Sequence, residues 1–227
     1  MDLTLLSSMA APSMGFVALS LDFSAVVIGS LGGSLFAVDR KLDLIGAMAL
    51  ALLCGLGGGL LRDMIMQVGD VYILRTSYAI PASAITAAIV FFLSAPFQRH
   101  PHLIEWIDIF SVALYVAAGA GKAIAYGLAP WTVILLGMLT GVGGGMLRDV
   151  FLGDVPRIFQ KSNFYAVCAI LGSIAYLAAS SLGLTGFLPA LICTIVTIGS
   201  RRLSLRYDIK SPSQSDVHNA LRERRGK

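Results

Sequence analysis

The sequence is poor in charge and lacks the residue patterns on which most soluble activities depend. Charged residues make up 13% of its 227 residues, whereas soluble domains carry about 25%. Its three cysteines, Cys54, Cys168 and Cys193, lie within apolar segments at spacings that fit neither a metal site nor a disulfide framework. The chain has no recognisable nucleophile–base group, phosphate-binding loop or haem motif. We therefore expect no enzymatic activity, no cofactor and no bound metal.

Hydrophobic residues, by contrast, are abundant. They form 56% of the chain, and the mean hydropathy is +0.80. A helix crosses a bilayer with about 20 predominantly apolar residues. Seven segments meet this requirement: 20–38, 44–66, 78–96, 106–127, 131–152, 164–182 and 184–200. Because these runs lack the alternation of barrel strands, the sequence predicts an all-α membrane protein with seven transmembrane helices.

The basic residues predict how these helices are oriented. The net charge of +4 comes largely from residues 201–227, after the last predicted helix. A basic tail in that position is typical of a cytoplasmic segment that touches anionic lipid, so we expect no nucleic-acid partner. With the N-terminus outside, most loop arginines and lysines fall inside the cell, and Arg62 and Arg75 are the exceptions. Residues 1–19 lack the basic start of a cleavable signal peptide, so we expect none.

A nine-residue motif occurs twice in the chain. It reads Gly-Leu-Gly-Gly-Gly-Leu-Leu-Arg-Asp at 55–63 and Gly-Val-Gly-Gly-Gly-Met-Leu-Arg-Asp at 141–149. The two copies are 86 residues apart, and Asp22 and Asp108, well upstream of them, keep the same offset. A shared offset over this distance indicates a duplicated unit rather than two chance glycine runs.

Each duplicated unit contains three predicted helices, within 20–96 and 106–182, and the helix at 184–200 lies outside both. Because an odd number of spans reverses direction, the second unit enters the membrane inverted. Inverted repeats commonly form pathways through membranes, with the working site near the midplane. The predicted architecture is therefore an inverted repeat of two three-helix units plus a seventh helix, a 6+1 fold.

Each motif contains three consecutive glycines, and a glycine inside a helix costs about 1 kcal/mol relative to alanine. The triplets therefore predict bends in the second and fifth helices, which would turn carbonyl oxygens toward a polar route. The alternative is close packing, since small residues let two helix backbones approach. The candidate residues are Gly57, Gly58, Gly59, Gly143, Gly144 and Gly145.

Ionisable side chains at membrane depth are costly and usually face a cavity or a partner. The predicted topology brings Asp22 near Arg62 at the outer side of the membrane. It brings Asp108 near Arg148 at the inner side. We therefore predict two charge clusters that the inverted repeat relates to each other. The alternative is that the arginines extend to the lipid headgroups.

Three further charged residues belong to the same helices. Asp63 and Asp149 directly follow the two arginines, and each either serves as a cation site or counter-charge, or accepts a hydrogen bond from the following loop. Lys122 lies about 21 Å along the fourth helix, where it must meet water, a carboxylate or carbonyl oxygens. The first unit has Phe36 in the matching place. This asymmetry makes Lys122 a candidate for a gate or voltage-sensing charge, with extension to the outer surface as the alternative.

The paired motif, together with Asp-Leu-Ile-Gly at 43–46, Gly-Lys-Ala at 121–123 and Asp-Val-Pro at 154–156, resembles prokaryotic members of the TRIC family. These are trimeric intracellular cation channels, and the resemblance covers roughly residues 20–200. It implies a homotrimer in which every subunit has its own hourglass pore for K⁺ and Na⁺, lined by the bent second and fifth helices. The pore residues carried over by position are the six triplet glycines, Arg62, Arg148 and Lys122.

The chain departs from the animal members of that family in one respect. It keeps the glycine triplet in both repeats and lacks their Lys-Glu-Val motif. Their lipid-dependent gating and their location in an organelle are therefore not carried over. We expect this protein to lie in a prokaryotic plasma membrane.

Three functions compete for this pattern. A passive channel for monovalent cations is the main interpretation. A secondary transporter of a small amino acid such as glycine is the alternative, because inverted repeats with broken helices suit alternating access equally well. Similar bacterial proteins also carry a glycine-transporter or UPF0126 domain name. A lipid-binding scaffold is the third, and it would leave the buried charges without a purpose.

Overall fold

The chain folds into a bundle of membrane-length helices. The computed structural model describes residues 3–93, 101–160 and 164–209, with side chains described from residue 19 onward and not at position 101. Within these ranges every regular element is helical. The elements are α1 (Leu3–Asp39), α2 (Leu44–Met66), α3 (Tyr72–Arg75), α4 (Ala79–Phe92), α6 (Pro101–Ala125), α7 (Pro130–Phe151), the 3-10 helix η1 (Arg157–Phe159), α8 (Tyr165–Ser181) and α9 (Leu188–Arg206).

Seven long helices therefore take the places of the seven predicted segments, which confirms the predicted fold class. Five of them are long and apolar enough to cross a membrane, while α4 and α8 are apolar but shorter. Several helices differ in length from the predicted segments. α1 begins at Leu3, although its candidate span, Leu19–Asp39, agrees with the predicted 20–38. α6 begins at Pro101 rather than at 106, and α9 covers Leu188–Arg206 rather than 184–200. The last three residues of the predicted segment 78–96 lie outside the described ranges.

Local chemistry explains where several helices begin. Asp43 is the N-cap of α2, and its Oδ1 accepts a hydrogen bond of 2.7 Å from the backbone N–H of Gly46. This is the usual way to satisfy a free amide at a helix start. Pro130 and Pro189 lie in the first turns of α7 and α9, where the missing proline N–H costs nothing.

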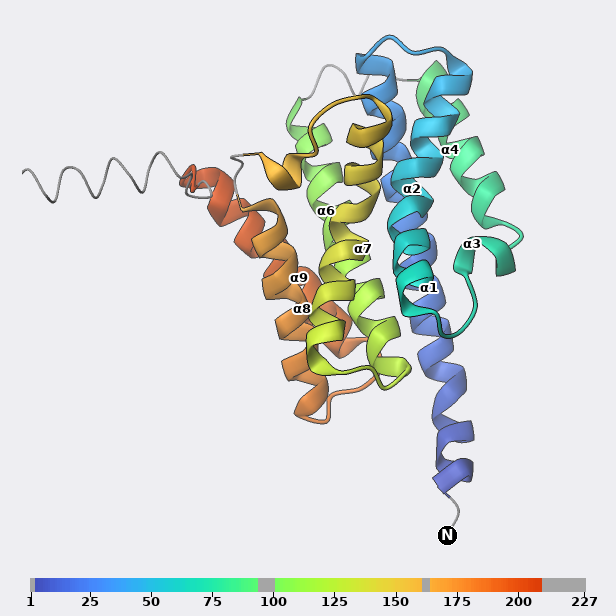
Figure 1. Cartoon of the computed structure of the whole chain (residues 1–227), viewed down its shortest axis with the longest axis vertical. Helices are drawn as coiled ribbons and strands as arrows, with labels where there is room; N and C mark the ends of the chain where they lie inside the picture. The colour runs from blue at the N-terminus through green and yellow to red at the C-terminus, as the bar shows by residue number, and fades with distance from the viewer. Residues whose placement is uncertain (1–2, 94–100, 161–163, 210–227) are drawn as a thin grey trace, which may run out of the picture.

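Successive long helices run in opposite directions, as Figure 1 shows. α1 packs against α2, α4 and α6, and α2 also packs against α7. α8 and α9 cover the other side of α6. The N-terminal part of α1 extends beyond the rest of the bundle (Figure 1).

The connections divide between the two ends of the bundle. We name one the Lys122 end, which carries the connections after α2, α6 and α8. The other, the Arg148 end, carries the connections after α1 and α7. Two short helical turns that the sequence did not predict, α3 and η1, follow α2 and α7 in corresponding places of the two halves.

The outside of the bundle is strongly apolar. Leu74 and Trp131 are 82% exposed, and Phe92 and Phe159 are 73% exposed. Much of the interior, by contrast, consists of alanine, glycine and serine. Small residues inside and large apolar residues outside are the arrangement expected of helices that pack closely within a lipid bilayer.

Candidate functional site

The two glycine triplets meet where α2 and α7 cross. A Cβ atom added to Gly58 would lie less than 3.0 Å from the carbonyl oxygen of Thr140, and one added to Gly144 would lie 2.5 Å from that of Cys54. Thr140 and Cys54 are themselves 86 residues apart, so the crossing obeys the same offset as the sequence repeat. At the middle glycines, the geometry is that of the packing alternative. α2 and α7 are each one uninterrupted helix, and the predicted bend stays a prediction.

The third glycine of each triplet has a different environment. At Gly59 the nearest atom to an added Cβ is Nη2 of Arg62, at 3.8 Å. At Gly145 the corresponding Nη2, of Arg148, lies at 3.9 Å. These distances are ordinary contacts, so Gly59 and Gly145 border the two guanidinium groups rather than the helix crossing.

The first charge cluster comprises Asp22, Arg62, Asp63 and Lys122. Nη1 of Arg62 donates to Oδ1 of Asp22 at 3.0 Å, and Nε donates to Oδ1 of Asp63 at 2.7 Å. The arginine side chain is fully buried, and its Nη2 has no hydrogen-bond partner among the described residues. The predicted contact between Asp22 and Arg62 is therefore present.

Lys122 joins this cluster from α6. Its Nζ donates to Oδ1 of Asp63 at 2.7 Å and to the backbone carbonyl of Asp70 at 2.9 Å. The lysine thus meets a carboxylate and a carbonyl, two of the environments that its depth requires. Because Asp70 lies in the loop after α2, Lys122 ties the second half of the bundle to the first at this end.

The second charge cluster comprises Arg148, Asp149 and the ring of Phe36. Nε and Nη2 of Arg148 both donate to Oδ1 of Asp149, at 2.8 and 2.6 Å. The guanidinium carbon lies 4.2 Å from the centre of the Phe36 ring, a cation–π distance. Phe36 thus contacts Arg148 from the position that corresponds to Lys122.

Asp108 and Arg148 line the same cavity, and the predicted second cluster stays a prediction. Within the described residues these two side chains form no ion pair or hydrogen bond with each other. The physical reason is that Asp149 and the Phe36 ring already take the guanidinium. Asp108 instead lines the cavity beside Arg157.

Asp63 and Asp149 also hold the short helices that follow them. Oδ2 of Asp63 accepts a hydrogen bond of 2.8 Å from the backbone N–H of Tyr72. Oδ2 of Asp149 accepts one of 3.1 Å from the N–H of Arg157. In both residues one carboxylate oxygen neutralises the arginine, and the other accepts a hydrogen bond from the following loop. The roles of counter-charge and of loop hydrogen-bond acceptor, which the sequence offered as alternatives, therefore occur together.

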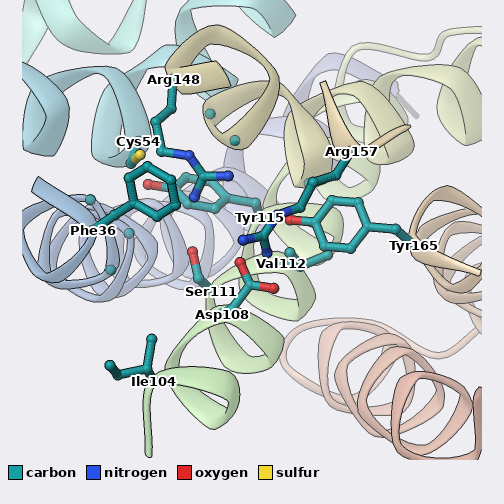
Figure 2. A pocket seen from close by; sticks show the side chains of 16 residues that line it. Phe36, Cys54, Ile104, Asp108, Ser111, Val112, Tyr115, Arg148, Arg157 and Tyr165 are labelled. Atoms are coloured by element: carbon teal, nitrogen blue, oxygen red, sulfur yellow. The ribbon is translucent and has the colours of Figure 1, made fainter. Parts of the chain in front are cut away.

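A cavity of about 80 Å³ reaches into the bundle beside the second cluster (Figure 2). A single water needs about 10–15 Å³ of such space, so several waters fit. Figure 2 shows the guanidinium of Arg157 and the carboxylate of Asp108 pointing toward each other at one side of the cavity. The other lining residues include glycines of α1 and α7, Cys54, Ser111, Tyr115 and Tyr165.

The sequence did not single out Tyr115, Phe36 or Tyr165 as site residues, and isolated aromatic residues in an apolar helix give no local signal. Among the described residues, no three His, Cys, Asp or Glu side chains converge in a way that would hold a metal ion.

Comparisons with known proteins identify relatives over most of the chain. The family model described as "Glycine transporter" matches twice, at residues 19–95 and 105–181, and the two matches are again 86 residues apart. A UPF0126 membrane protein of Vibrio cholerae is 28% identical over 197 residues, which cover 85% of this chain and 81% of that protein. The UPF0126 inner membrane protein YadS of Escherichia coli is 27% identical, over 85% of this chain and 94% of that protein. A UPF0126 membrane protein of Deinococcus radiodurans is 30% identical, over 67% and 72%.

Solved structures agree with this assignment. The TRIC trimeric intracellular cation channel orthologue from Rhodobacter sphaeroides superposes with a TM-score of 0.78 at 27% identity. The match covers 85% of this chain and 99% of that one. A further prokaryotic TRIC channel gives a TM-score of 0.74 at 25% identity, over 85% and 98%. The chain is a membrane protein and a prokaryotic member of the TRIC family, whose bacterial relatives carry the name UPF0126 and whose family model is described as a glycine transporter.

Proposed function

We propose that this protein is a passive channel for K⁺ and Na⁺, with one route through each subunit of a homotrimer. The observation that carries the proposal is the cavity that runs from the Arg148 end to the crossing of α2 and α7. Beyond that crossing lies the first charge cluster, which continues the polar path toward the Lys122 end. The triplet glycines, Arg62, Arg148 and Lys122 are the proposed lining.

Two arginines beside a cation route need neutralisation, and the carboxylates supply it. Asp22 and Asp63 offset Arg62, and Asp149 offsets Arg148. Asp108 lines the cavity together with Arg148 and Arg157, and its carboxylate faces the Arg157 guanidinium (Figure 2). The carboxylates thus offset the arginines, so that the proposed route does not repel a cation.

Trimer formation, bilayer insertion and orientation are parts of the same proposal. The exposed apolar side chains, such as Leu74 and Trp131, need lipid or a neighbouring subunit to cover them. The Rhodobacter sphaeroides relative is described as trimeric. The basic residues at the Arg148 end, Arg40 and Arg157 among them, favour a cytoplasmic Arg148 end, with the N-terminus outside and an inner-membrane location.

Planar bilayer recording of the purified protein tests the function. Discrete unitary currents that reverse at the K⁺ equilibrium potential are expected. Silent bilayers, together with saturable glycine uptake into proteoliposomes, would instead favour the alternative, a small-amino-acid transporter, which the description of the family model suggests. An inverted repeat suits either function, so this measurement decides between them.

The native Cys54 offers a second test of the route. It lines the cavity, whereas Cys168 and Cys193 are buried outside it. Ag⁺ is a monovalent cation that binds thiols, so it should inhibit the current when it is added from the Arg148 end. The Cys54→Ala variant should resist Ag⁺, and a Cys168→Ala, Cys193→Ala variant should remain sensitive. Equal inhibition of both variants would contradict the proposed route.

Lys122 is proposed to hold the Lys122 end closed. A Lys122→Gln variant loses the contacts to Asp63 and to the Asp70 carbonyl. Because a hydrogen bond to a charged group contributes about 1.5–3 kcal/mol, the open probability should rise by about tenfold or more. The voltage dependence should become shallower, since one charge leaves the field. Arg75→Gln is the matched control, because Arg75 forms an exposed pair with Asp70 at the same end.

A further inference from the structure

Tyr115 of α6 lies at the inner limit of the cavity and is almost completely buried, with 4% of its surface exposed. Its hydroxyl donates a hydrogen bond to the backbone carbonyl of Gly55 in α2. Its ring lies against Gly29 of α1. A Cβ added to Gly29 would be 2.8 Å from the Tyr115 hydroxyl and 2.9 Å from the ring carbon Cε2. Tyr115, labelled in Figure 2, therefore fills a space that exists only because position 29 is glycine.

The inverted repeat makes this contact unusual. Positions 29 and 115 are 86 residues apart, so they are equivalent places in the two units. One unit contributes a large aromatic ring there and the other contributes no side chain at all. A single side chain thus occupies the place where the two units face each other, and the space has no room for a second ring.

Tyr115 also stands between the two polar regions of the molecule. On one side it borders the cavity that Cys54 and Asp108 line. On the other side its hydroxyl binds the Gly55 carbonyl of α2, the helix that carries Arg62 of the first cluster. On the proposed route, a cation that leaves the cavity toward the first cluster meets this ring.

The hydroxyl connects the ring to the glycine triplet of α2. In an α-helix the carbonyl of residue 55 accepts the N–H of residue 59, which is the last glycine of the triplet. The Tyr115 hydroxyl binds the same carbonyl oxygen. If α2 bends at the triplet and this helical bond opens, the hydroxyl keeps the carbonyl satisfied, which matters in a dry interior. The equivalent carbonyl in α7, that of Gly141, has no such partner from position 29, because glycine has no side chain.

We propose that Tyr115 is the central barrier of the cation route, and that its hydroxyl couples this barrier to bending of α2 at Gly57–Gly59. This inference rests on the proposed channel function. It assigns two separate roles to one residue. The ring sets which cations pass, and the hydroxyl sets how long the bent, conducting state lasts.

Two variants separate these roles in planar bilayers. Tyr115→Ala removes the ring, so the unitary conductance should rise, and tetramethylammonium should become permeant relative to K⁺. Tyr115→Phe keeps the ring and loses only the hydroxyl, so conductance should stay at the wild-type value. Its mean open time should fall by about two- to tenfold, as expected for one lost hydrogen bond. Tyr176→Phe is the matched control, because Tyr176 is buried against Gly121 outside the cavity and should change neither quantity.

The outcomes are distinguishable from failure of the channel proposal. A silent wild-type protein would refute the channel itself. If the wild type conducts and Tyr115→Ala keeps its unitary conductance and still excludes tetramethylammonium, the barrier is refuted. Unchanged open times in Tyr115→Phe would refute the coupling to α2. If Tyr115→Ala does not assemble, Gly29→Ala gives the second route, since its methyl group must displace the Tyr115 ring and should alter the conductance.

Discussion

An Asp63→Asn variant is expected to lose about 3–5 kcal/mol of unfolding free energy, the usual effect of removing one member of a buried ion pair. The Asp63 carboxylate is 2% exposed and accepts hydrogen bonds from Arg62, Lys122 and the backbone of Tyr72. The amide that replaces it has no charge and one oxygen. Arg62 would then keep only Asp22, and Lys122 would keep only the backbone carbonyl of Asp70.

The measurement is unfolding of the purified protein in mixed micelles, compared with two other variants. Asp70→Asn alters an exposed pair with Arg75, so its effect should stay within about 1 kcal/mol. Asp149→Asn should cost less than Asp63→Asn, because Asp149 neutralises one cation and Phe36 continues to contact Arg148. Equal losses for Asp63→Asn and Asp70→Asn would contradict the view that the first cluster is a buried network.

A second substitution locates the source of the loss. In the Asp63→Asn background, Lys122→Met removes one of the two cations that have lost their counter-charge. If these charges interact directly, the double variant should be less destabilised than the sum of the two single variants, by about 0.5–3 kcal/mol. Additive losses would place the effect of Asp63 in the Tyr72 hydrogen bond instead.

The overall arrangement of this protein could be predicted from the sequence, because each of its determinants is local or periodic. Long apolar runs specify the helices, and a constant offset of 86 residues specifies the inverted units. The contact of Asp22 with Arg62 follows from these two facts. The helix ends are less predictable: α1 extends back to Leu3 through Pro12 and Gly15, residues that disfavour a helix interior.

The direct contacts of Arg148 could not be predicted, because the two repeats differ in sequence at some positions. The offset places Asp108 and Arg148 as it places Asp22 and Arg62. However, Phe36 stands at the position equivalent to Lys122, and its ring packs against the guanidinium of Arg148. Sequence symmetry therefore predicted which residues lie in the same region and failed to predict which of them pair.

The short helices α3 and η1 escaped prediction for a different reason. Neither has an apolar periodicity of its own. Each is held by a carboxylate from earlier in the chain that accepts a backbone N–H at its start. Asp63 accepts the N–H of Tyr72 in α3, and Asp149 accepts the N–H of Arg157 in η1. A hydrogen bond of this kind depends on how the loop folds back, and no local pattern records it. The Tyr115 contact with Gly55 is non-local in the same way.

A Gly58→Ala variant is expected to lose about 1–3 kcal/mol of unfolding free energy, the typical result of forcing an extra carbon into a packed core. The new methyl group would lie less than 3.0 Å from the carbonyl oxygen of Thr140. That oxygen belongs to the backbone of α7 and can move away only if the two helices separate. Gly144→Ala should behave alike, since its methyl group would meet the Cys54 carbonyl.

Gly59→Ala is the matched control from the same triplet, and it separates packing from bending. Its methyl group would meet nothing closer than 3.8 Å, and alanine favours a helix by up to about 1 kcal/mol over glycine. The folded protein should therefore be as stable as the wild type or more so. If the triplet also has to bend for conduction, Gly59→Ala should reduce the open probability while the protein remains stably folded. Wild-type currents in Gly59→Ala, with the expected instability of Gly58→Ala, would assign the triplets to helix packing alone.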